Sequence, residues 1–291
     1  MSDWSAADIG DQTGRHFVVT GANSGLGKET ALALGRAGAT VTLACRDVLK
    51  AQPVAAEMGD RASVRHLDLA DLRSVREFAG AVGDIDVLIN NAGVMGTPLR
   101  RTADGFEMQF GTNHLGHFAL TGLLLDRISE RVVTMSSFMH HLGQVDLADP
   151  NYERRRYERW TAYGQSKLAN LQFALELARR LSAAGSSVSS AAAHPGYAAT
   201  GLQSHTESFM DAVMGLGNRL LAQPAAEGAL PELYAATSAD AASGGFYGPK
   251  QLFGMRGRPG KSRMSGAARN TEAAAGLWQL SEDLTGVTFP L

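Results

Sequence analysis

The sequence predicts an α/β protein in which helices cover both faces of a doubly wound parallel sheet. Short runs rich in Val, Leu and Ala alternate with segments of helical period up to about residue 195. The strand runs are continuously apolar, which is typical of parallel strands buried on both faces. A glycine-rich turn follows the first run, where parallel α/β folds commonly bind nucleotides.

Six strands are expected along the chain, joined by right-handed helical crossovers. They are expected at residues 16–20, 40–44, 64–67, 87–90, 131–135 and 187–193. Helices are expected at about residues 26–36, after Asp47, and at about 72–82, 104–125, 163–181 and 272–284. The chain shows no repeat or low-complexity linker, so one domain over residues 1–291 is expected.

Composition describes a globular protein with a substantial core. The 291 residues are 44% hydrophobic and 19% charged, with a net charge of -2 and a pI near 6.4. A chain with this charge lacks the excess of Lys and Arg that binding to nucleic acid requires. No run approaches the roughly 20 apolar residues of a membrane span. The single cysteine, Cys45, excludes an intrachain disulfide and is interpreted as inert core. Residues 1–15 contain no apolar signal segment, so a soluble protein in the cytoplasm is expected, with peripheral attachment to a membrane as an open alternative.

The turn after the first predicted strand carries the run Thr20-Gly21-Ala22-Asn23-Ser24-Gly25-Leu26-Gly27. Its spacing is G-x-x-x-G-x-G, not the commoner G-x-G-x-x-G. Glycines allow a tight turn and close approach to a pyrophosphate, while the following helix offers free N–H groups and its positive dipole end. A plain glycine turn is the alternative, but the position favours a dinucleotide and a Rossmann-type fold. The candidate cofactor contacts are Gly21, Asn23, Ser24, Gly25, Leu26 and Gly27.

The end of the second strand indicates which dinucleotide is bound. An acid there commonly bonds the ribose of NAD, whereas an arginine accommodates the 2′-phosphate of NADP. Cys45 stands where the acid is expected and Arg46 follows it, with Lys28 as a possible second cation. NADP(H) is therefore favoured over NAD(H). The alternative is that Arg46 is only solvated; Asp47 is expected to cap the next helix in either case.

Polar or small residues also follow the third and fourth strands. Asp68 and Leu69 fit an adenine contact. The run Asn90-Asn91-Ala92-Gly93 fits a cofactor-facing turn, with Asn90, Ala92 and Gly93 as candidate contacts.

Tyr163 and Lys167 lie four residues apart at the start of a predicted helix, so both side chains share one helix face. An ammonium beside a phenol favours the phenolate, and we expect it to lower the tyrosine pKa from about 10 toward neutrality. A phenol tuned in this way can exchange protons at physiological pH. By itself this spacing usually marks only a solvated face; the preceding motifs give it weight.

Together these motifs resemble the short-chain dehydrogenase/reductase superfamily over nearly the whole chain. The match comprises the glycine loop, Asp68, the Asn-Asn-Ala-Gly run, Asn113, Ser137, the Tyr-x-x-x-Lys pair and the run His194-Pro195-Gly196. The runs Ala-Cys-Arg-Asp at 44–47 and Asn-His-Leu-Gly-His-Phe at 113–118 resemble the retinol-dehydrogenase-like branch, which includes bacterial oxidoreductases of unassigned substrate. That branch usually prefers NADP.

The resemblance implies roles for four residues. Tyr163 would exchange the proton, and Lys167 would lower its pKa and hold the nicotinamide ribose. Both residues are also candidate cofactor contacts. Ser137 would bond the substrate oxygen, a choice over Ser136 that rests on family alignment, while Ser136 is expected to turn into the sheet. Asn113 would hold a water that relays protons to the lysine, or be an ordinary buried asparagine bonded to backbone. All four are candidate catalytic residues.

The resemblance also places the nicotinamide end of the cofactor and a substrate lid. Pro195, Gly196 and Thr200 would lie near the nicotinamide, although Thr200 could equally cap the next helix. A helical lid at about 198–223 is rich in Met and other apolar residues. It favours an apolar carbonyl or alcohol that is retinoid-, steroid- or lipid-like, although core packing or a dimer contact would give the same pattern.

The segment between Ser137 and Tyr163 is longer than usual for the family and suggests a lid or binding loop. Its run Arg154-Arg155-Arg156 is expected to be solvated. His140 and His141 are candidates to line the pocket, but neither has companions at metal-ligand spacing, so no metal site is expected.

Three functions could use these motifs. An NADP-dependent oxidoreductase acting on CH–OH donors is favoured, because a non-catalytic NADP(H)-binding sensor or scaffold would not need all four catalytic residue types. A sugar-nucleotide epimerase usually carries a different glycine spacing and a larger C-terminal domain. A homo-oligomer built on the helices of Asn113 and Tyr163 is possible by resemblance.

Overall fold

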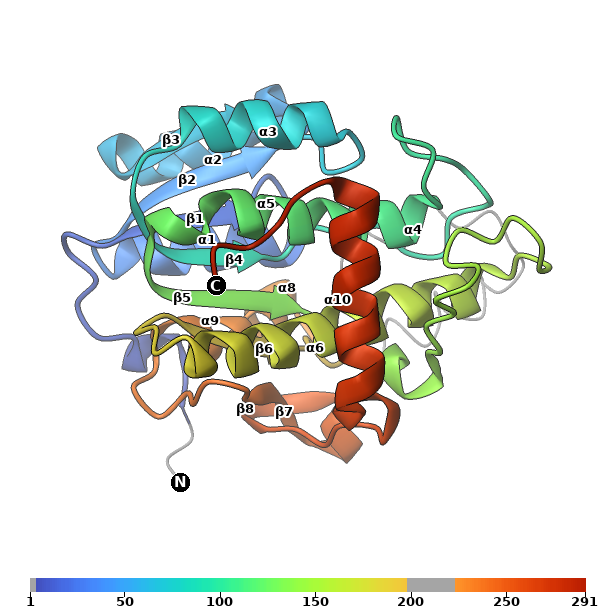
Figure 1. The fold of residues 1–291 in the computed structure, drawn as a ribbon. Coiled ribbons are helices and arrows are strands. Elements are labelled where there is room, and N and C mark those ends of the chain that lie inside the picture. Colours follow the sequence, from blue (N-terminus) through green and yellow to red (C-terminus); the bar gives the residue numbers. More distant parts are fainter. Residues whose placement is uncertain (1–3, 198–222) are drawn as a thin grey trace.

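The computed structural model describes residues 4–197 and 223–291, and eight strands in these ranges form one sheet (Figure 1). The strand order is β3-β2-β1-β4-β5-β6-β7-β8, and only β8 runs antiparallel to its neighbour. The strands are β1 His16–Thr20, β2 Thr40–Cys45, β3 Ala62–His66, β4 Ile85–Asn90, β5 Ile128–Met135, β6 Ser189–Ala193, β7 Phe246–Gln251 and β8 Arg256–Lys261. The predicted Rossmann-type, doubly wound sheet is confirmed.

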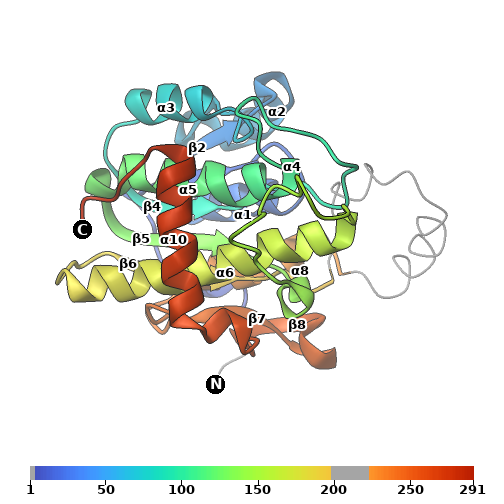
Figure 2. The ribbon, with the colours of Figure 1, turned by 45° about the vertical axis from the view of Figure 1, so that its right-hand side comes forward.

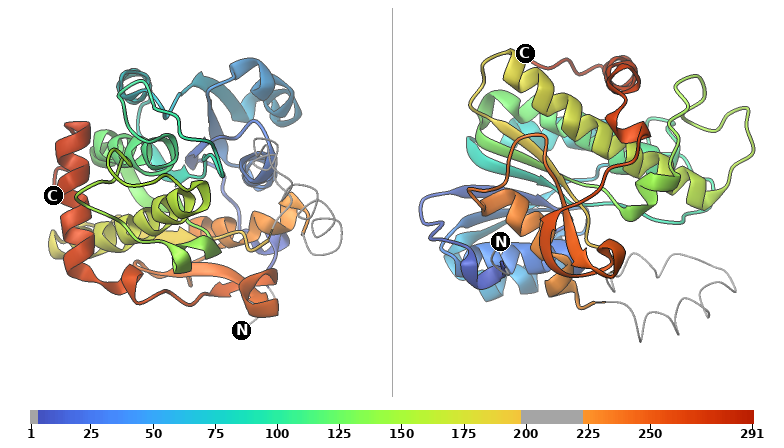
Figure 3. Two further views of the ribbon diagram at one scale, coloured as in Figure 1. Left: turned by 90° about the vertical axis from the view of Figure 1, so that its right-hand side faces the viewer. Right: turned by 90° about the horizontal axis from the view of Figure 1, so that it is seen from below.

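Helices pack on both faces of the sheet, with the blue α1 and yellow-green α6 on opposite sides in the right-hand view of Figure 3. Phe17 and Val19 contribute to one core, and Val18 between them to the other. The first layer contains α1 Gly25–Arg36, α2 Val48–Met58 and α9 Leu230–Thr237. The second contains α3 Leu72–Ala81, α5 Gly116–Leu124, α6 Arg159–Ala183 and α10 Thr271–Thr285. Burial on both faces explains the continuous apolar runs.

The C-terminal helix α10 crosses α5 and α6, as Figures 1 and 2 show. The Trp278 ring packs against the rings of Phe118 and Phe173, with centroid distances of 5.2 and 5.8 Å. His114 Nε2 also lies 2.9 Å from Ser281 Oγ within this core. The chain's own C-terminal helix therefore covers part of the outer faces of α5 and α6, where it crosses them.

Two predicted helix boundaries need correction. The helix predicted from residue 104 begins only at Met108, as α4 Met108–Phe110, because Arg101 and Glu107 pair in an isolated bridge and the Glu107 side chain caps the helix. A π-helical turn, Gly111–Leu115, then leads into α5. The helix predicted from residue 163 begins at Arg159, where Glu158 accepts hydrogen bonds from the N–H groups of Trp160 and Thr161.

The elements after residue 223 were largely unanticipated. β7, β8, α9 and the short helix α8 Ala225–Gly228 had no predicted counterparts. Glycine and proline within β7 and β8 weaken their strand signal, and Pro249 pairs with Pro259 near the sheet edge. The predicted lid lies outside the described residues except for Gln223. In the described ranges, no helix has the length and apolar character needed to cross a bilayer.

Candidate active site

A cavity of about 770 Å³ opens at the carboxyl ends of the parallel strands. Its walls include residues that follow β1, β2, β4, β5 and β6, in that order Gly21, Arg46, Asn91, Ser137 and Pro195. Strand β1 lies between β2 and β4, where the chain order of the sheet reverses. Ligands of open α/β sheets bind at such a switch point.

The glycine loop forms one wall of this cavity, and all six predicted loop contacts line it. Gly21 and Gly25 have positive φ angles of 68° and 54°, which favour glycine. A Cβ on Gly27 would lie 2.5 Å from Asn91 Nδ2 and 2.6 Å from the Gly21 carbonyl oxygen. The Asn91 amide in turn donates to the Thr20 carbonyl at 2.7 Å. Helix α1 can therefore approach the loop closely only because residue 27 has no side chain.

The end of the cavity next to β2 and β3 carries charges of both signs, and Lys50 pairs there with Asp47 at 3.3 Å. Arg46 is exposed and lines the cavity, as do Asp68 and Leu69. Asp47 caps α2 by accepting from the Lys50 N–H at 3.2 Å, which confirms the predicted cap. Lys50 lines this end and Lys28 does not. Lys50 stands three residues after the predicted cap Asp47, in the first turn of α2, and this position could have pointed to it.

The turn after β4 presents a different asparagine from the one predicted. Asn90 is fully buried and donates to Thr121 Oγ1 at 2.9 Å, so it lies behind the cavity wall. Asn91, Ala92 and Gly93 line the cavity instead. The N–H groups of Asn91 and Ala92 both donate to Thr20 Oγ1 at 2.9 Å. The turn is thereby fixed against the start of the glycine loop.

Tyr163, Lys167 and Ser137 meet at the opposite wall. Lys167 Nζ lies 5.8 Å from the centroid of the Tyr163 ring and donates to the Met135 carbonyl at 3.2 Å. Ser137 Oγ accepts from the Met139 N–H at 3.2 Å. In that contact Ser137 Oγ is the acceptor, so its own proton stays available for another acceptor.

Burial dominates the protonation of this pair. It raises the pKa of Tyr163 to about 12, although the neighbouring Ser137 hydroxyl opposes the rise. Burial also lowers the pKa of Lys167 to about 8, and the charge of Glu232 opposes that fall. The predicted lowering of the Tyr163 pKa is thus wrong for the protein by itself. At neutral pH the phenol keeps its proton and the lysine is mostly charged.

Asn113 lies in the π-helical turn and ties two segments together. Its Oδ1 accepts from the Val94 N–H at 2.7 Å, and its Nδ2 donates to the Val94 carbonyl and Ser166 Oγ, both at 2.9 Å. A Cβ on Gly93 would lie 3.0 Å from Asn113 Oδ1 and 3.4 Å from Lys167 Nζ. These contacts match the buried-asparagine alternative while keeping Asn113 close to the lysine.

The polar side chains next to Ser137 are bonded within the protein, although Ser136 also forms part of the cavity wall. Ser136 Oγ donates to the Lys167 carbonyl at 2.8 Å and is buried, as expected of the serine that turns inward. His140 is also buried, with Nδ1 2.7 Å from the Ser137 carbonyl oxygen and Nε2 accepting from the Ser265 N–H at 3.3 Å. His140 and His141 do not line the cavity; Phe138 and Met139 do. The expectation for the two histidines is not met.

The turn after β6 completes the mouth. Pro195 and Gly196 line it as predicted, and Gly196 has a φ of 65°. A Cβ there would lie 2.4 Å from the Met255 carbonyl oxygen. Met255 also lines the cavity, which the sequence did not indicate. Thr200 lies outside the described residues.

Residues 15–211 match the family model for short chain dehydrogenases. This chain belongs to the short-chain dehydrogenase/reductase family. Within it the chain is retinol-dehydrogenase-like: it is 41% identical to human retinol dehydrogenase 13 over 95% of this chain and 86% of that protein. It is 42% identical to human retinol dehydrogenase 11, over 94% and 86%.

Solved structures agree with this family placement. An uncharacterized protein from Mycobacterium paratuberculosis is 50% identical, with a TM-score of 0.88 over all of both chains. A provisional NAD(P)-dependent gluconate 5-dehydrogenase from Beutenbergia cavernae, solved with NADP at low occupancy, is 25% identical. Its TM-score is 0.63, over 81% of this chain and 95% of that one.

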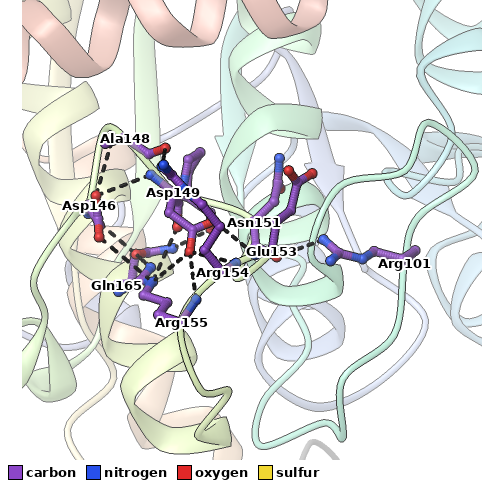
Figure 4. A network of polar contacts seen from close by, with 10 residues as sticks. Arg101, Asp146, Ala148, Asp149, Asn151, Glu153, Arg154, Arg155 and Gln165 are labelled. Atoms are coloured by element: carbon purple, nitrogen blue, oxygen red, sulfur yellow. Dashed lines mark hydrogen bonds and ion pairs between the residues drawn. The ribbon is translucent and has the colours of Figure 1, made fainter.

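In this short-chain dehydrogenase/reductase, polar contacts hold the long segment between Ser137 and α6 in place, as Figure 4 shows for residues 146–155. The Asp149 carboxylate accepts from the backbone N–H of Arg155 at 3.1 Å. The Arg155 guanidinium lies 3.7 Å from the centroid of the Tyr152 ring and donates to Gln165 Oε1 at 2.5 Å. Arg155 is half-buried, so the predicted solvated run describes only Arg154 and Arg156.

The described parts of the chain hold neither a reactive cysteine nor a cluster of metal ligands. Cys45 is buried, and burial raises its pKa to about 11, which fits the interpretation as inert core. Across residues 4–197 and 223–291, no three His, Cys, Asp or Glu side chains gather as metal ligands.

Proposed function

We propose that the protein is an NADP(H)-dependent oxidoreductase that interconverts a carbonyl and an alcohol. The observation that carries this proposal is the convergence of Tyr163, Lys167 and Ser137 on one wall of a cavity whose other wall is the glycine loop. The retinol dehydrogenase relatives support the same class of reaction.

Tyr163, Ser137 and Lys167 are each assigned a separate role in the reaction. When bound, the nicotinamide supplies or accepts the hydride. Tyr163 gives its proton to the substrate oxygen during reduction and takes it back during oxidation. Ser137 donates a hydrogen bond to that oxygen, since its hydroxyl proton is not used in the bond that it accepts from the Met139 N–H. The Lys167 ammonium stabilises the phenolate that remains.

The cofactor would lie along the carboxyl edge of the sheet. The N–H groups at the start of α1 and the glycine loop fit its pyrophosphate, and Asp68 and Leu69 fit its adenine. Pro195 and Gly196 fit the nicotinamide end. Asn113 would contribute through its place beside Lys167, as the proposed holder of a relay water.

The substrate is proposed to be apolar, of retinoid, steroid or lipid-like character. Phe138, Met139, Trp160 and Met255 line the catalytic end of the cavity. Their large apolar side chains favour a ligand that buries hydrocarbon beside the reacting oxygen.

Replacing Arg46 with Ala is expected to weaken NADPH by about 1–3 kcal/mol and to leave NADH nearly unchanged, because only NADPH carries the 2′-phosphate. Calorimetric titration with both cofactors measures this. Arg36→Ala, at an exposed arginine paired with Glu57 and outside the cavity lining, is the control. Equal losses for the two cofactors would remove the 2′-phosphate assignment.

Replacing Gly27 with Ala is expected to raise the dissociation constant for NADPH at least about tenfold, since the new methyl group would displace the Asn91 amide or the Gly21 carbonyl. The control is Gly80→Ala in α3, where a Cβ meets nothing within 4 Å. Fluorescence titration of both variants gives the comparison. Wild-type affinity in Gly27→Ala would show that the loop does not hold the cofactor.

The rival function is a non-catalytic NADP(H)-binding sensor or scaffold. Titration with NADPH and NADH, followed by NADPH oxidation with a panel of apolar carbonyls, separates the two. Turnover of any panel member supports the enzyme. Tight binding without turnover by a protein with an intact site favours the sensor.

For location and assembly, we propose a cytoplasmic protein, consistent with its single, buried cysteine. A homo-oligomer built on α5 and α6 is disfavoured, because Trp278 of α10 packs against Phe118 and Phe173 on these helices. An assembly would use another surface.

A further inference from the structure

The turn between β7 and β8 presents three apolar side chains to solvent. Phe253 is 93% exposed, Leu252 53% and Met255 38%. Single exposed apolar residues are ordinary, but three within four positions of one turn form a local apolar projection. We call residues 252–255 the hairpin tip.

The backbone of the hairpin tip is unfavourable for the residues that occupy it. Leu252 and Phe253 have φ angles of 48° and 57°, in the left-handed region. Glycine and asparagine adopt this region readily, whereas bulky side chains do so rarely. Strained positions of this kind are concentrated at sites of function. The two largest apolar side chains of the tip therefore stand where the backbone alone would favour Asn or Gly.

Positive charge flanks the hairpin tip. Lys250 precedes it, and Arg256 and Arg258 follow it; Lys250 and Arg258 are exposed. Within the described residues these three cations form no ion pair. Residues 241–271 contain six Lys or Arg and no Asp or Glu. The charge of Asp8, from the N-terminal part of the chain, acts on Arg258, which leaves Lys250 and Arg256 without a nearby acid of this kind among the described residues. The tip thus combines an apolar end with a base that is cationic overall.

The hairpin tip stands at the mouth of the cavity. Gly254 and Met255 line the cavity, and the Met255 carbonyl accepts from the Tyr197 N–H at 2.9 Å. Phe138, which lines the same cavity, is 48% exposed. The orange-red end of the hairpin projects from the body of the molecule beside β8 in Figure 2. A surface that receives the tip would therefore face the entrance.

We propose that the hairpin tip docks on a lipid bilayer containing anionic headgroups. Phe and Leu side chains insert at the boundary of headgroups and acyl chains, and Lys and Arg are attracted to anionic lipid. A stable protein interface buries roughly 800 Å² on each partner, which four residues cannot supply. Delivery of an apolar substrate from the bilayer to the cavity rests on the proposed function; the docking itself does not.

The primary test is co-sedimentation of the full chain with vesicles at low salt. Phosphatidylcholine vesicles with roughly a third phosphatidylglycerol are expected to bind the protein, and vesicles of phosphatidylcholine alone to bind it far less. Salt is expected to weaken the binding. Absence of binding to the anionic vesicles, or equal binding to both kinds, would overturn the proposal.

The double variant Leu252→Asn/Phe253→Asn removes the apolar end and suits the left-handed backbone. It is expected to lose vesicle affinity at least about tenfold, with an unchanged or raised Tm and unchanged NADPH affinity. The control Leu49→Asn replaces another exposed leucine, 78% exposed, which also lies next to a lysine, and should bind vesicles normally. Retained binding by the double variant would locate docking elsewhere.

Neutralising Lys250, Arg256 and Arg258 to Gln is expected to weaken binding to anionic vesicles by about fivefold per cation. Turnover of a water-soluble carbonyl is measured in parallel. Unchanged turnover with lost vesicle binding supports the docking site, whereas lost turnover with normal vesicle binding bears only on the proposed function. Self-association that the double variant abolishes, without vesicle binding by the wild type, would show that the tip binds protein.

Discussion

Tyr163→Phe is expected to abolish measurable hydride transfer while leaving NADPH affinity within about threefold of wild type. Phe keeps the ring at the cavity wall but has no proton to give, and general acid catalysis contributes about 10²–10⁴-fold in rate. Because burial raises the Tyr163 pKa to about 12, the wild-type phenol is fully protonated at neutral pH and can act as the acid. Single-turnover oxidation of NADPH measures the loss directly.

The matched control is Tyr234→Phe, which removes a phenol from α9 outside the cavity lining. It should leave turnover near the wild-type rate. Retained turnover in Tyr163→Phe would show that the proton comes from another group. Weakened NADPH binding together with lost turnover would instead indicate that the phenol serves the cofactor.

The glycine loop and the Tyr-x-x-x-Lys pair could be predicted because each depends on a short run at the junction of a strand and a helix. Gly27 illustrates this: its spacing predicted a tight loop that approaches a pyrophosphate, and in the structure Asn91 and the Gly21 carbonyl leave no room for a side chain at residue 27. The choice between Asn90 and Asn91 could not be made in the same way. Side chains alternate along a strand, so an error of one residue at the strand end reverses which asparagine faces the cavity.

Local sequence patterns could not predict features of the site that depend on residues far away in the chain. The sequence predicts a lowered Tyr163 pKa from the neighbouring lysine, but burial raises it instead, and burial depends on the whole fold. Met255 reaches the cavity from a hairpin whose prolines and glycines hide its strands. Glu232 carried no signal at all, because no local pattern indicates a carboxylate beneath a nucleotide-binding helix.

Glu232→Gln is expected to change the pH dependence of stability by about 3 kcal/mol. Glu232 is fully buried in α9 and accepts a hydrogen bond from Thr30 of α1 through Oε1, while its Oε2 has no hydrogen-bond partner among the described residues. Burial raises the Glu232 pKa from 4.5 to about 7, although Thr30 and the charge of Lys167 oppose the rise. The difference between these two values corresponds to about 3 kcal/mol of free energy of unfolding.

The sign follows from proton binding. The folded protein holds the Glu232 proton more tightly than the unfolded chain, so this group's contribution is complete below about pH 4.5 and is lost as the pH rises through about 7. Glutamine cannot ionise, so the variant should gain stability relative to wild type as the pH rises through that window. Urea unfolding at several pH values measures the difference. Glu227→Gln, at an exposed glutamate in α8, should show a flat difference.

The difference in unfolding free energy between Glu232→Gln and wild type could also prove independent of pH. That result would mean that Glu232 is ionised at no cost, and that water or rearrangement compensates its burial. If the expected slope appears, the retained carboxylate needs a reason, because it destabilises the fold at neutral pH. Its charge opposes the fall in the Lys167 pKa caused by burial. The same variant should therefore lower the Lys167 pKa further and shift the alkaline limb of kcat to lower pH, an effect that a purely structural glutamate would not produce.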